Sequence, residues 1–406
     1  MKKKKILIVN YAPLFPIVMA SQDRVVQMAK RMSQDHDVTI ISSFKNEEQR
    51  LLCSQEMGKN GLHLELVKAR NFDGSEVKNK FLGIIFLLKY YFTFTSSDYF
   101  YSGNNHFNNR VVNYINRNYF DIVQIQYWFN WKIFKKIRKP CVKSIDSQDI
   151  LYDKREQQFK LDQNGRVSIF TRRILNRYKN LEVGAYKTAD VLISITEDDK
   201  KILDKICPGT KKVVIPTGQN ISYFKEYPSN RTEPVVLFYG GMSGKENVDA
   251  FWRLYLKIFP IIRSQVKNVK LLVVGANPPV EILQLNNGSD IEVTGYLDDV
   301  RPYLAVSSVM VLPLDVAAGF RSRTVEVMAM GIPVVGTHKA LDNLRMVNEV
   351  NCFIHDDDAE LAKYAIRLLK NEVLRLGVGK LAQDFCEQFY SIENTYGRLS
   401  EYYGRT

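Results

Sequence analysis

Residues 309–335 have the sequence VMVLPLDVAAGFRSRTVEVMAMGIPVV, in which two short apolar runs flank a segment that carries two arginines and a glutamate. The run at 309–312 is typical of a buried strand, and a loop follows it. Ser322 predicts a helix start, and Gly331-Ile332-Pro333 predicts the end of that helix and a new strand from Val334. A strand, a helix and a second strand in this order are typical of a parallel sheet.

The same alternation extends over the rest of the chain. Short β-branched runs separated by helical patterns predict further strands at 6–9, 38–42, 122–125, 191–195, 213–215, 235–238, 271–274 and 291–293. Such alternation is typical of parallel sheets that are covered by helices on both faces. The predicted fold class is therefore α/β.

Length and charge divide the chain into two parts. Its 406 residues exceed the usual domain size of ~100 to 200 residues, so two domains are expected. The stretch 216–234 has turn chemistry without periodicity and predicts the linker. The first 230 residues hold 38 Lys and Arg against 23 Asp and Glu, net +15, whereas the remainder holds 19 against 21, net −2. The basic part indicates an anionic partner, either a membrane surface, a phosphorylated lipid or nucleic acid; a solvated basic surface is the alternative.

Several classes of protein are excluded by the sequence. The five cysteines are scattered without a CxxC motif and the five histidines form no HExxH motif, so we expect neither a zinc site nor a disulfide framework, and the chain resembles a cytosolic protein. The basic start followed by 6–9 is better explained as a first strand than as a signal peptide. The longest apolar stretch, 81–88, is much shorter than the ~20 residues that span a bilayer. No glycine precedes Gly58, which argues against an N-terminal dinucleotide-binding turn.

One candidate ligand-binding segment runs from Gly240 to Lys245, after a predicted strand and before a helix expected near Asn247. It is not a P-loop, because Glu246 stands where a Ser or Thr is required. Exposed amides at such a helix start favour contact with an anion or a sugar. A plain tight turn is the alternative.

The other candidate segment places Arg321 and Arg323 beside the predicted helix start at Ser322. Guanidinium groups, free helix amides and the helix dipole together favour a diphosphate there. Glu326, one turn into the helix, could accept two hydrogen bonds from a ribose diol. The alternative is that Glu326 only interacts with the helix dipole and that the arginines are solvated.

These residues resemble the donor-binding signature of the retaining GT-B glycosyltransferases of family 4, the glycosyl transferases group 1. Glu326 matches the second glutamate of the family's EX7E motif. The resemblance extends over nearly the whole chain. It includes Phe238-Tyr239-Gly240-Gly241-Met242 with Asn247, similar to an FxGxM subgroup; Val293-Thr294-Gly295-Tyr296-Leu297, similar to the base-binding turn; and 177–195 and 215–224, similar to the segments around the domain crossing.

The sequence departs from the family pattern in three places. The first glutamate of EX7E falls on Ala318, the usual basic residue after the first strand of the second domain falls on Gly241, and the glycine pair after the first strand of the chain is replaced around 19–21. In the FxGxM subgroup a basic residue before the helix glutamate takes over phosphate binding. The resemblance therefore assigns that role to Arg321 and Arg323.

The resemblance implies two Rossmann-like domains facing each other across a cleft. Residues 1–222 are expected to bind the acceptor and 223–385 the nucleotide-sugar donor, while a helix within 386–406 packs back toward the first domain. The implied reaction is transfer of a hexosyl unit, with retention, from a UDP-linked sugar to a glycan or polyprenyl-linked acceptor in surface polysaccharide synthesis. A nucleotide-sugar 2-epimerase of the same fold is the alternative.

The chemistry implied by this resemblance concerns the leaving diphosphate. Arginines and a helix end can stabilise it, so no metal or cofactor is expected, and the general base is unassigned. The expected catalytic residues are Arg321, Arg323 and Lys245. The expected donor-binding residues are Gly240, Gly241, Gly295, Tyr296, Leu297, Gly319, Phe320, Ser322, Thr324 and Glu326.

Three further segments bear on partners. Residues 81–94 are either a buried helix or an interfacial one, and with the basic first part they predict peripheral contact of a cytoplasmic enzyme with the inner face of the cytoplasmic membrane. Nucleic acid is not an expected partner, because the basic residues are dispersed and no recognised motif accompanies them. Asp356-Asp357-Asp358 is predicted to cap a helix over 359–369 instead of binding a metal.

Overall fold

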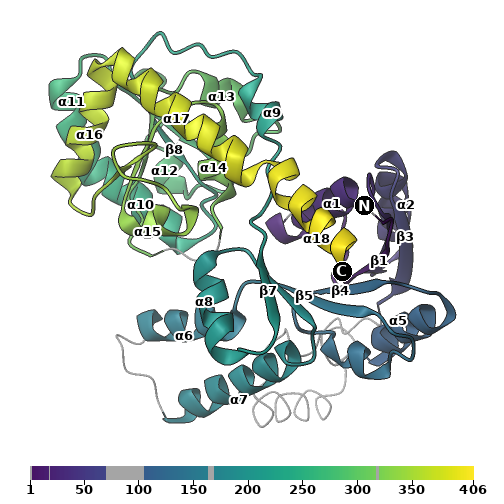
Figure 1. Ribbon diagram of the computed structural model, residues 1–406. Coiled ribbons are helices and arrows are strands. Elements are labelled where there is room, and N and C mark those ends of the chain that lie inside the picture. Colours follow the sequence, from purple (N-terminus) through teal and green to yellow (C-terminus); the bar gives the residue numbers. More distant parts are fainter. Residues whose placement is uncertain (1, 18, 70–104, 163–168, 317–319) are drawn as a thin grey trace. The chain divides into compact units, whose positions relative to one another are not determined.

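The computed structural model describes residues 2–17, 19–69, 105–162, 169–316 and 320–406 (Figure 1). They form two compact units. Unit 1 consists of Met1–Pro216 and Thr395–Thr406, and unit 2 of Thr217–Asn394.

Unit 1 is built on a parallel sheet with the strand order β3-β2-β1-β4-β5-β6-β7. The strands are β1 Lys5–Asn10, β2 Asp37–Phe44, β3 His63–Lys68, β4 Ile122–Gln126, β5 Val142–Gln148, β6 Val191–Ser194 and β7 Lys211–Val214. The helices are α1 Ala20–Met32, α2 Glu47–Lys59, α5 Asn105–Arg117, η2 Trp131–Lys136, α6 Leu151–Asp162, α7 Ile169–Tyr186, α8 Glu197–Ile206 and α18 Arg398–Arg405.

Unit 2 is built on a second parallel sheet, with the order β10-β9-β8-β11-β12-β13. The strands are β8 Val235–Tyr239, β9 Lys270–Val274, β10 Ile291–Val293, β11 Val309–Leu312, β12 Val334–Gly336 and β13 Phe353–Ile354. The helices are α9 Ile221–Lys225, α10 Lys245–Arg253, η3 Leu254–Ile258, α11 Phe259–Gln265, α12 Val280–Leu283, α13 Arg301–Ala305, α14 Ser322–Ala329, α15 His338–Leu341, η4 Asp342–Leu344, α16 Asp358–Lys370 and α17 Glu372–Tyr390, followed by η5 Glu393–Gly397 at the unit boundary.

The predicted α/β class is confirmed, and the predicted strands are present within one or two residues of their expected ends. Strands β3, β5 and β13 were not predicted. Strand β5 has no apolar run, and its buried polar side chains find partners on other elements: Ser144 Oγ lies 2.8 Å from Tyr403 Oη, and Ser147 Oγ donates to the carbonyl of Ile193 (2.8 Å). Long-range hydrogen bonds of this kind leave no periodic signal in the sequence.

The segment predicted as an irregular linker contains the short helix α9. Asn220 caps it, since its Oδ1 accepts from the amide of Tyr223 (3.3 Å), and Ile221 and Phe224 are buried in the core of unit 2. One turn with two core residues is too short to show a helical period.

The C-terminal helix α18 packs beside α1 within unit 1 (Figure 1). His36 Nε2 lies 2.9 Å from the carbonyl of Ser400, and Tyr403 Oη donates to Gln124 Oε1 of β4 (2.7 Å). The end of the chain is therefore part of the core of unit 1.

None of the helices that the structure describes is long and apolar enough to cross a membrane. Residues 81–94, predicted as a buried or interfacial helix, lie outside the described residues.

Candidate functional site

The loops after β8 and β9 join directly, backbone to backbone, at the carboxyl edge of the sheet in unit 2. The amide of Gly240 donates to the carbonyl of Val274 (3.0 Å), and the amide of Met242 donates to the carbonyl of Ala276 (2.9 Å). Gly275 has a φ of +156°, and a Cβ atom on it would lie 1.9 Å from the carbonyl oxygen of Gly240. Only glycine allows this approach, so the two loops form one backbone surface.

Arg323 reaches this surface from α14. A Cβ atom on Gly241 would lie 3.2 Å from Arg323 Nη2, and Arg323 Cζ lies 5.6 Å from the ring centroid of Tyr239. The guanidinium group therefore lies against the backbone position where the family pattern has a basic residue. A side chain at position 241 would compete with Arg323 for this space.

Glu326 is one turn into α14 and is held by the last residue of β8. Tyr239 Oη donates to Glu326 Oε2 (2.8 Å). Burial and the nearby Glu326 carboxylate raise the pKa of Tyr239, so the phenol remains a hydrogen-bond donor. Tyr239 was predicted only as part of the FxGxM pattern, and its position as the last residue of a strand was the available signal for a role at the site.

Arg321 lies at the N-terminal cap position of α14 and is directed toward α15. Its Nη2 donates to the carbonyl of Lys339 (2.6 Å). Burial lowers the pKa of Arg321, and the Asp342 carboxylate opposes that shift. The first turns of α14 thus carry Arg321, Arg323 and Glu326, with Arg323 and Glu326 directed to the end of β8 and Arg321 directed to α15.

The remaining predicted residues differ in how far they are buried. Lys245, the first residue of α10, is 86% exposed and pairs with Asp249 (2.6 Å), so it is a surface residue. Gly295 has a φ of +71° after β10, and it is followed by Tyr296, which is 75% exposed.

Other predicted donor-site residues belong partly to the core. Thr324 is buried, Ser322 is half-buried, and Leu297 packs against the core of unit 2. Phe320 stacks obliquely on Tyr390, with ring centroids 5.3 Å apart. Gly319, and Ala318 at the position of the missing motif glutamate, lie outside the described residues.

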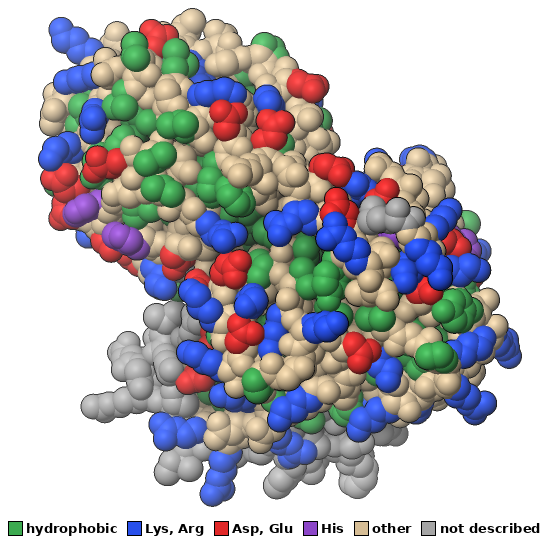
Figure 2. All heavy atoms as spheres, viewed as in Figure 1, with side chains coloured by type: hydrophobic (Ala, Val, Ile, Leu, Met, Phe, Trp, Pro, Cys, Tyr) green, Lys and Arg blue, Asp and Glu red, His purple; other side chains and the backbone are tan. Residues whose placement is uncertain are grey.

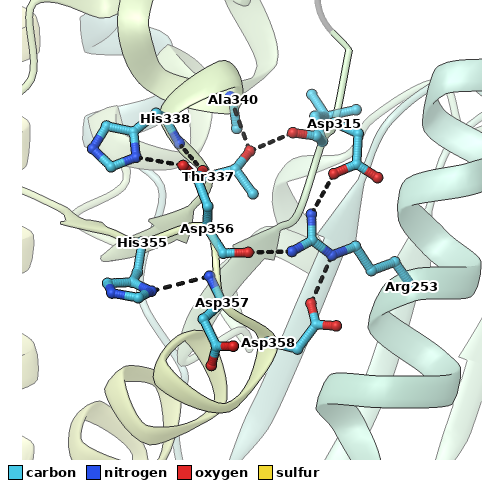
Figure 3. A network of polar contacts seen from close by, with 10 residues as sticks. Arg253, Asp315, Thr337, His338, Ala340, His355, Asp356, Asp357 and Asp358 are labelled. Atoms are coloured by element: carbon cyan, nitrogen blue, oxygen red, sulfur yellow. Dashed lines mark hydrogen bonds and ion pairs between the residues drawn. The ribbon is translucent and has the colours of Figure 1, made fainter.

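A polar network fixes the other loops of the same edge (Figure 3). Arg253 Nη1 pairs with Asp315 Oδ1 (2.6 Å), and its Nε pairs with Asp358 Oδ1 (2.6 Å). His338 Nδ1 lies 3.0 Å from Asp356 Oδ2. The loops that follow β11, β12 and β13 are therefore joined through polar side chains.

The aspartate triplet in this network has structural partners. Asp357 Oδ1 accepts from the amides of Ala359 (2.9 Å) and Glu360 (3.2 Å), which confirms the predicted helix cap of α16. Among the described residues, no group of three or more His, Cys, Asp or Glu side chains is placed to hold a metal ion.

The carboxyl edge of the sheet in unit 1 is built from polar side chains. Tyr127 follows β4 with a φ of 55°, and Gln148 ends β5 with a φ of 56°. Gln148 Nε2 donates to Gln126 Oε1 (2.7 Å), and both side chains are buried. Sequence analysis assigned this part to the acceptor without naming residues, since no motif marks it.

Comparisons with known proteins agree with this architecture. Residues 233–371 match the family described as glycosyl transferases group 1. A sequence comparison with curated proteins finds no match. A sucrose-phosphate synthase from Thermosynechococcus elongatus has a similar structure, with a TM-score of 0.68 at 15% identity over 99% of each chain.

Two further solved structures are similar to the chain. Anabaena HepE, solved in complex with UDP and glucose, gives a TM-score of 0.64 at 14% identity over 99% of this chain and 100% of HepE. A mutant of S. aureus TarM, solved with fondaparinux, alpha-GlcNAc-glycerol and UDP, gives 0.62 at 12% identity over 98% and 99%. The chain thus has two parallel-sheet α/β domains as in the GT-B structures, and its residues 233–371 match a glycosyl transferases group 1 domain.

Proposed function

We propose that the protein is a retaining glycosyltransferase that moves a hexosyl unit from a UDP-sugar to a glycan or polyprenyl-linked acceptor in surface polysaccharide synthesis. One observation carries the proposal: Arg323, Glu326 and the glycine-lined backbone after β8 and β9 meet at one edge of the sheet, inside the segment that matches the group 1 family. The UDP found in similar structures supports this choice of nucleotide.

The diphosphate would lie between Arg323, the backbone near Gly241 and the first amides of α14. Negative charge grows on this leaving group as the glycosidic bond breaks, so fixed donors and cations lower the barrier. Arg321, held by Lys339, would orient the helix start and add positive charge. We expect activity without a metal ion, because these groups can neutralise the diphosphate. The general base stays unassigned, and a diphosphate oxygen is one candidate for the acceptor proton.

Glu326 would bind the ribose of the nucleotide. Its hydrogen bond from Tyr239 fixes the carboxylate, and a fixed carboxylate can accept from both hydroxyl groups of a vicinal diol. Tyr239 would thus be a positioning residue for Glu326, and both residues would affect UDP and UDP-sugar alike.

The acceptor is proposed to bind unit 1, with the enzyme peripheral at the inner face of the cytoplasmic membrane. The net charge of +15 over the first 230 residues supports an anionic surface as partner.

The function is tested by UDP release from a panel of UDP-sugars, with and without membrane extract as acceptor source. We expect release that depends on acceptor, product with the anomeric configuration of the donor, and full activity in EDTA. Arg323→Ala should lower kcat more than it raises KM, because the charge it stabilises is largest in the transition state. UDP release that is independent of acceptor, with a 2-epimeric sugar as product, would instead establish the epimerase. Loss of activity in EDTA would overturn the metal-free proposal.

A further inference from the structure

Unit 1 carries a basic groove of about 780 Å³ between α5 and the segment around η2. Four cations line it: Arg117, Lys135, Lys136 and Arg138. Three asparagines on α5 complete its polar wall, and the described lining contains no carboxylate. We call these four cations and their asparagine wall the basic groove.

The core of unit 1 forces these cations outward. In η2 the side chains of Ile133 and Phe134 are buried, and in α5 the side chains of Val111 and Ile115 are buried. The polar side chains next to these buried positions face away from the core, and all four cations are exposed. A polybasic segment, WKIFKKIRK at 131–139, is thus presented on one side of the unit.

The groove is held in shape by uncharged partners. Lys136 Nζ donates to Asn109 Oδ1 (3.0 Å), the amide of Arg138 donates to Asn116 Oδ1 (3.0 Å), and Lys135 Nζ lies 4.7 Å from the ring centroid of Trp131. On α8 of the same unit, by contrast, Lys200 pairs with Asp204 (2.9 Å) and Lys201 with Asp198 (2.8 Å). The positive charge of α8 is offset locally, whereas that of the basic groove is not offset by its lining.

The groove lies away from the ligand edge of the sheet. Asp121, four residues after α5, binds the amide of Lys5 at the start of β1 (2.8 Å), and its carbonyl accepts from Val142 at the start of β5 (2.8 Å). The C-terminal end of α5 and the chain at 138–142 are therefore at the amino edge of the sheet. Ligands of parallel sheets bind at the carboxyl edge, so the basic groove is not part of the transfer site.

We infer that the basic groove docks unit 1 on an anionic bilayer by binding the phosphate groups of its lipids. Clustered cations beside an aromatic side chain fit this surface, because lipid phosphates are anionic acceptors and Trp131 can lie at the headgroup level. Figure 2 shows Lys and Arg side chains spread over the visible part of unit 1, with Asp and Glu side chains among them. The inference rests on the proposed membrane-linked function and names the surface that would serve it.

The test uses the full chain and sedimentation with two kinds of vesicle: phosphatidylcholine alone, and phosphatidylcholine mixed with phosphatidylglycerol. The groove variant combines Lys135→Gln, Lys136→Gln and Arg138→Gln. The matched control combines Lys200→Gln, Lys201→Gln and Lys205→Gln, which removes the same charge from α8 of the same unit. We expect the groove variant to bind mixed vesicles about a hundredfold more weakly than the unchanged chain, and the control to stay within about threefold.

Equal losses in the two variants, or no loss in either, would overturn the inference, as would equal binding to both kinds of vesicle. Tighter binding of a DNA duplex than of mixed vesicles, lost in the groove variant, would also overturn it and assign the groove to nucleic acid. Thermal unfolding and UDP calorimetry on each variant separate the two proposals. A chain that binds vesicles through the groove but does not bind UDP contradicts the proposed donor site and leaves the docking surface supported.

Discussion

The carboxyl edges of the two sheets are built in opposite ways. In unit 2 the strands β8, β9 and β10 are followed by Gly240, Gly275 and Gly295, so backbone lines the edge and charged side chains reach it from α14. In unit 1 the loops after β1, β4, β5 and β6 contain no glycine, and large polar side chains such as Gln126 and Gln148 form the edge.

The difference indicates two ways of making a binding edge. A backbone edge allows a ligand to approach the main chain closely. It requires that no side chain occupies the space beside the backbone. A side-chain edge depends on buried polar partners, because a buried polar group without its partner is costly. We therefore expect substitutions that remove a buried charge to destabilise unit 1. We expect substitutions that add a side-chain atom beside the backbone to disturb the edge of unit 2.

Asp146→Ala should have the largest effect on stability. Arg24 Nε and Asp146 Oδ2 lie 3.0 Å apart, with both side chains buried in unit 1, so the variant leaves a guanidinium group without its counter-charge. Breaking a buried pair costs about 3–5 kcal/mol. Denaturant unfolding measures it, with Asp198→Ala, which breaks the exposed pair with Lys201, as a control that should not change the midpoint. A midpoint as high as that of the control would show that unit 1 does not depend on this buried pair.

Gly275→Ala should have the next largest effect, by separating the loops after β8 and β9. The added Cβ would lie 1.9 Å from the carbonyl oxygen of Gly240. We expect a loss of about 3 kcal/mol in unfolding free energy and much weaker UDP binding by calorimetry. Gly377→Ala in α17 is the control, because a Cβ there meets no atom within 4 Å. If both variants bind UDP equally well, the edge of unit 2 does not depend on backbone approach.

Glu182 links the stability of unit 1 to pH. Its Oε1 accepts from the amide of Leu151 (2.9 Å) and from Tyr186 Oη (2.7 Å), and its Oε2 accepts from the amide of Tyr152 (2.8 Å). Burial nevertheless raises the pKa of Glu182 from 4.5 to about 7. Between pH 4.5 and about 7, the folded chain therefore keeps a proton on Glu182 that the unfolded chain releases. The protonated group contributes up to about 3 kcal/mol to the unfolding free energy at low pH, and this contribution is lost as pH rises from 4.5 to 7.

The measurement for Glu182 is urea unfolding of the unchanged chain and of Glu182→Gln, at pH 5 and pH 8. The advantage of the unchanged chain over the variant should shrink toward pH 8. A difference that stays constant over this range would contradict the raised pKa.

Glu326→Ala tests the side-chain part of the edge in unit 2. Loss of a hydrogen bond to a charged group costs about 1.5–3 kcal/mol, so UDP and UDP-sugar should both bind roughly ten- to a hundredfold more weakly by calorimetry. Tyr239→Phe removes only the hydrogen bond that fixes the carboxylate and should weaken both ligands less. Unchanged UDP affinity in Glu326→Ala would rule out the ribose role.

Lys245→Ala should have the smallest effect, although sequence analysis assigns Lys245 to catalysis. The side chain is exposed and paired with Asp249, and exposed pairs contribute little. Steady-state kinetics should give kcat and KM within about twofold of the unchanged chain, with Arg323→Ala as the strongly affected comparison. A large fall in kcat for Lys245→Ala would contradict this expectation and assign Lys245 at the start of α10 to catalysis.

The α/β class and the helix start at Ser322 could be predicted because they rest on local patterns. Apolar runs with flanking turn residues determine strands such as β8 and β11. Helix α14 begins at Ser322 as predicted, although its N-cap position is Arg321 and no side chain caps it. Arg321, Arg323 and Glu326 were identified for the same reason, since they lie within six residues of one another.

Local sequence patterns were therefore sufficient to predict ten of the thirteen described strands and the charged helix of the candidate site. Three features required the folded chain: Tyr239 donates to Glu326, which is 87 residues away in the sequence, Gly275 must be glycine because Gly240 lies against it, and Lys245 faces solvent. Strand β5 was not predicted, because its buried Asp146 and Ser144 are bonded to Arg24 and Tyr403, which lie far away in the sequence. The physical reason is that burial and partner choice depend on residues far apart in the chain, which no local pattern records.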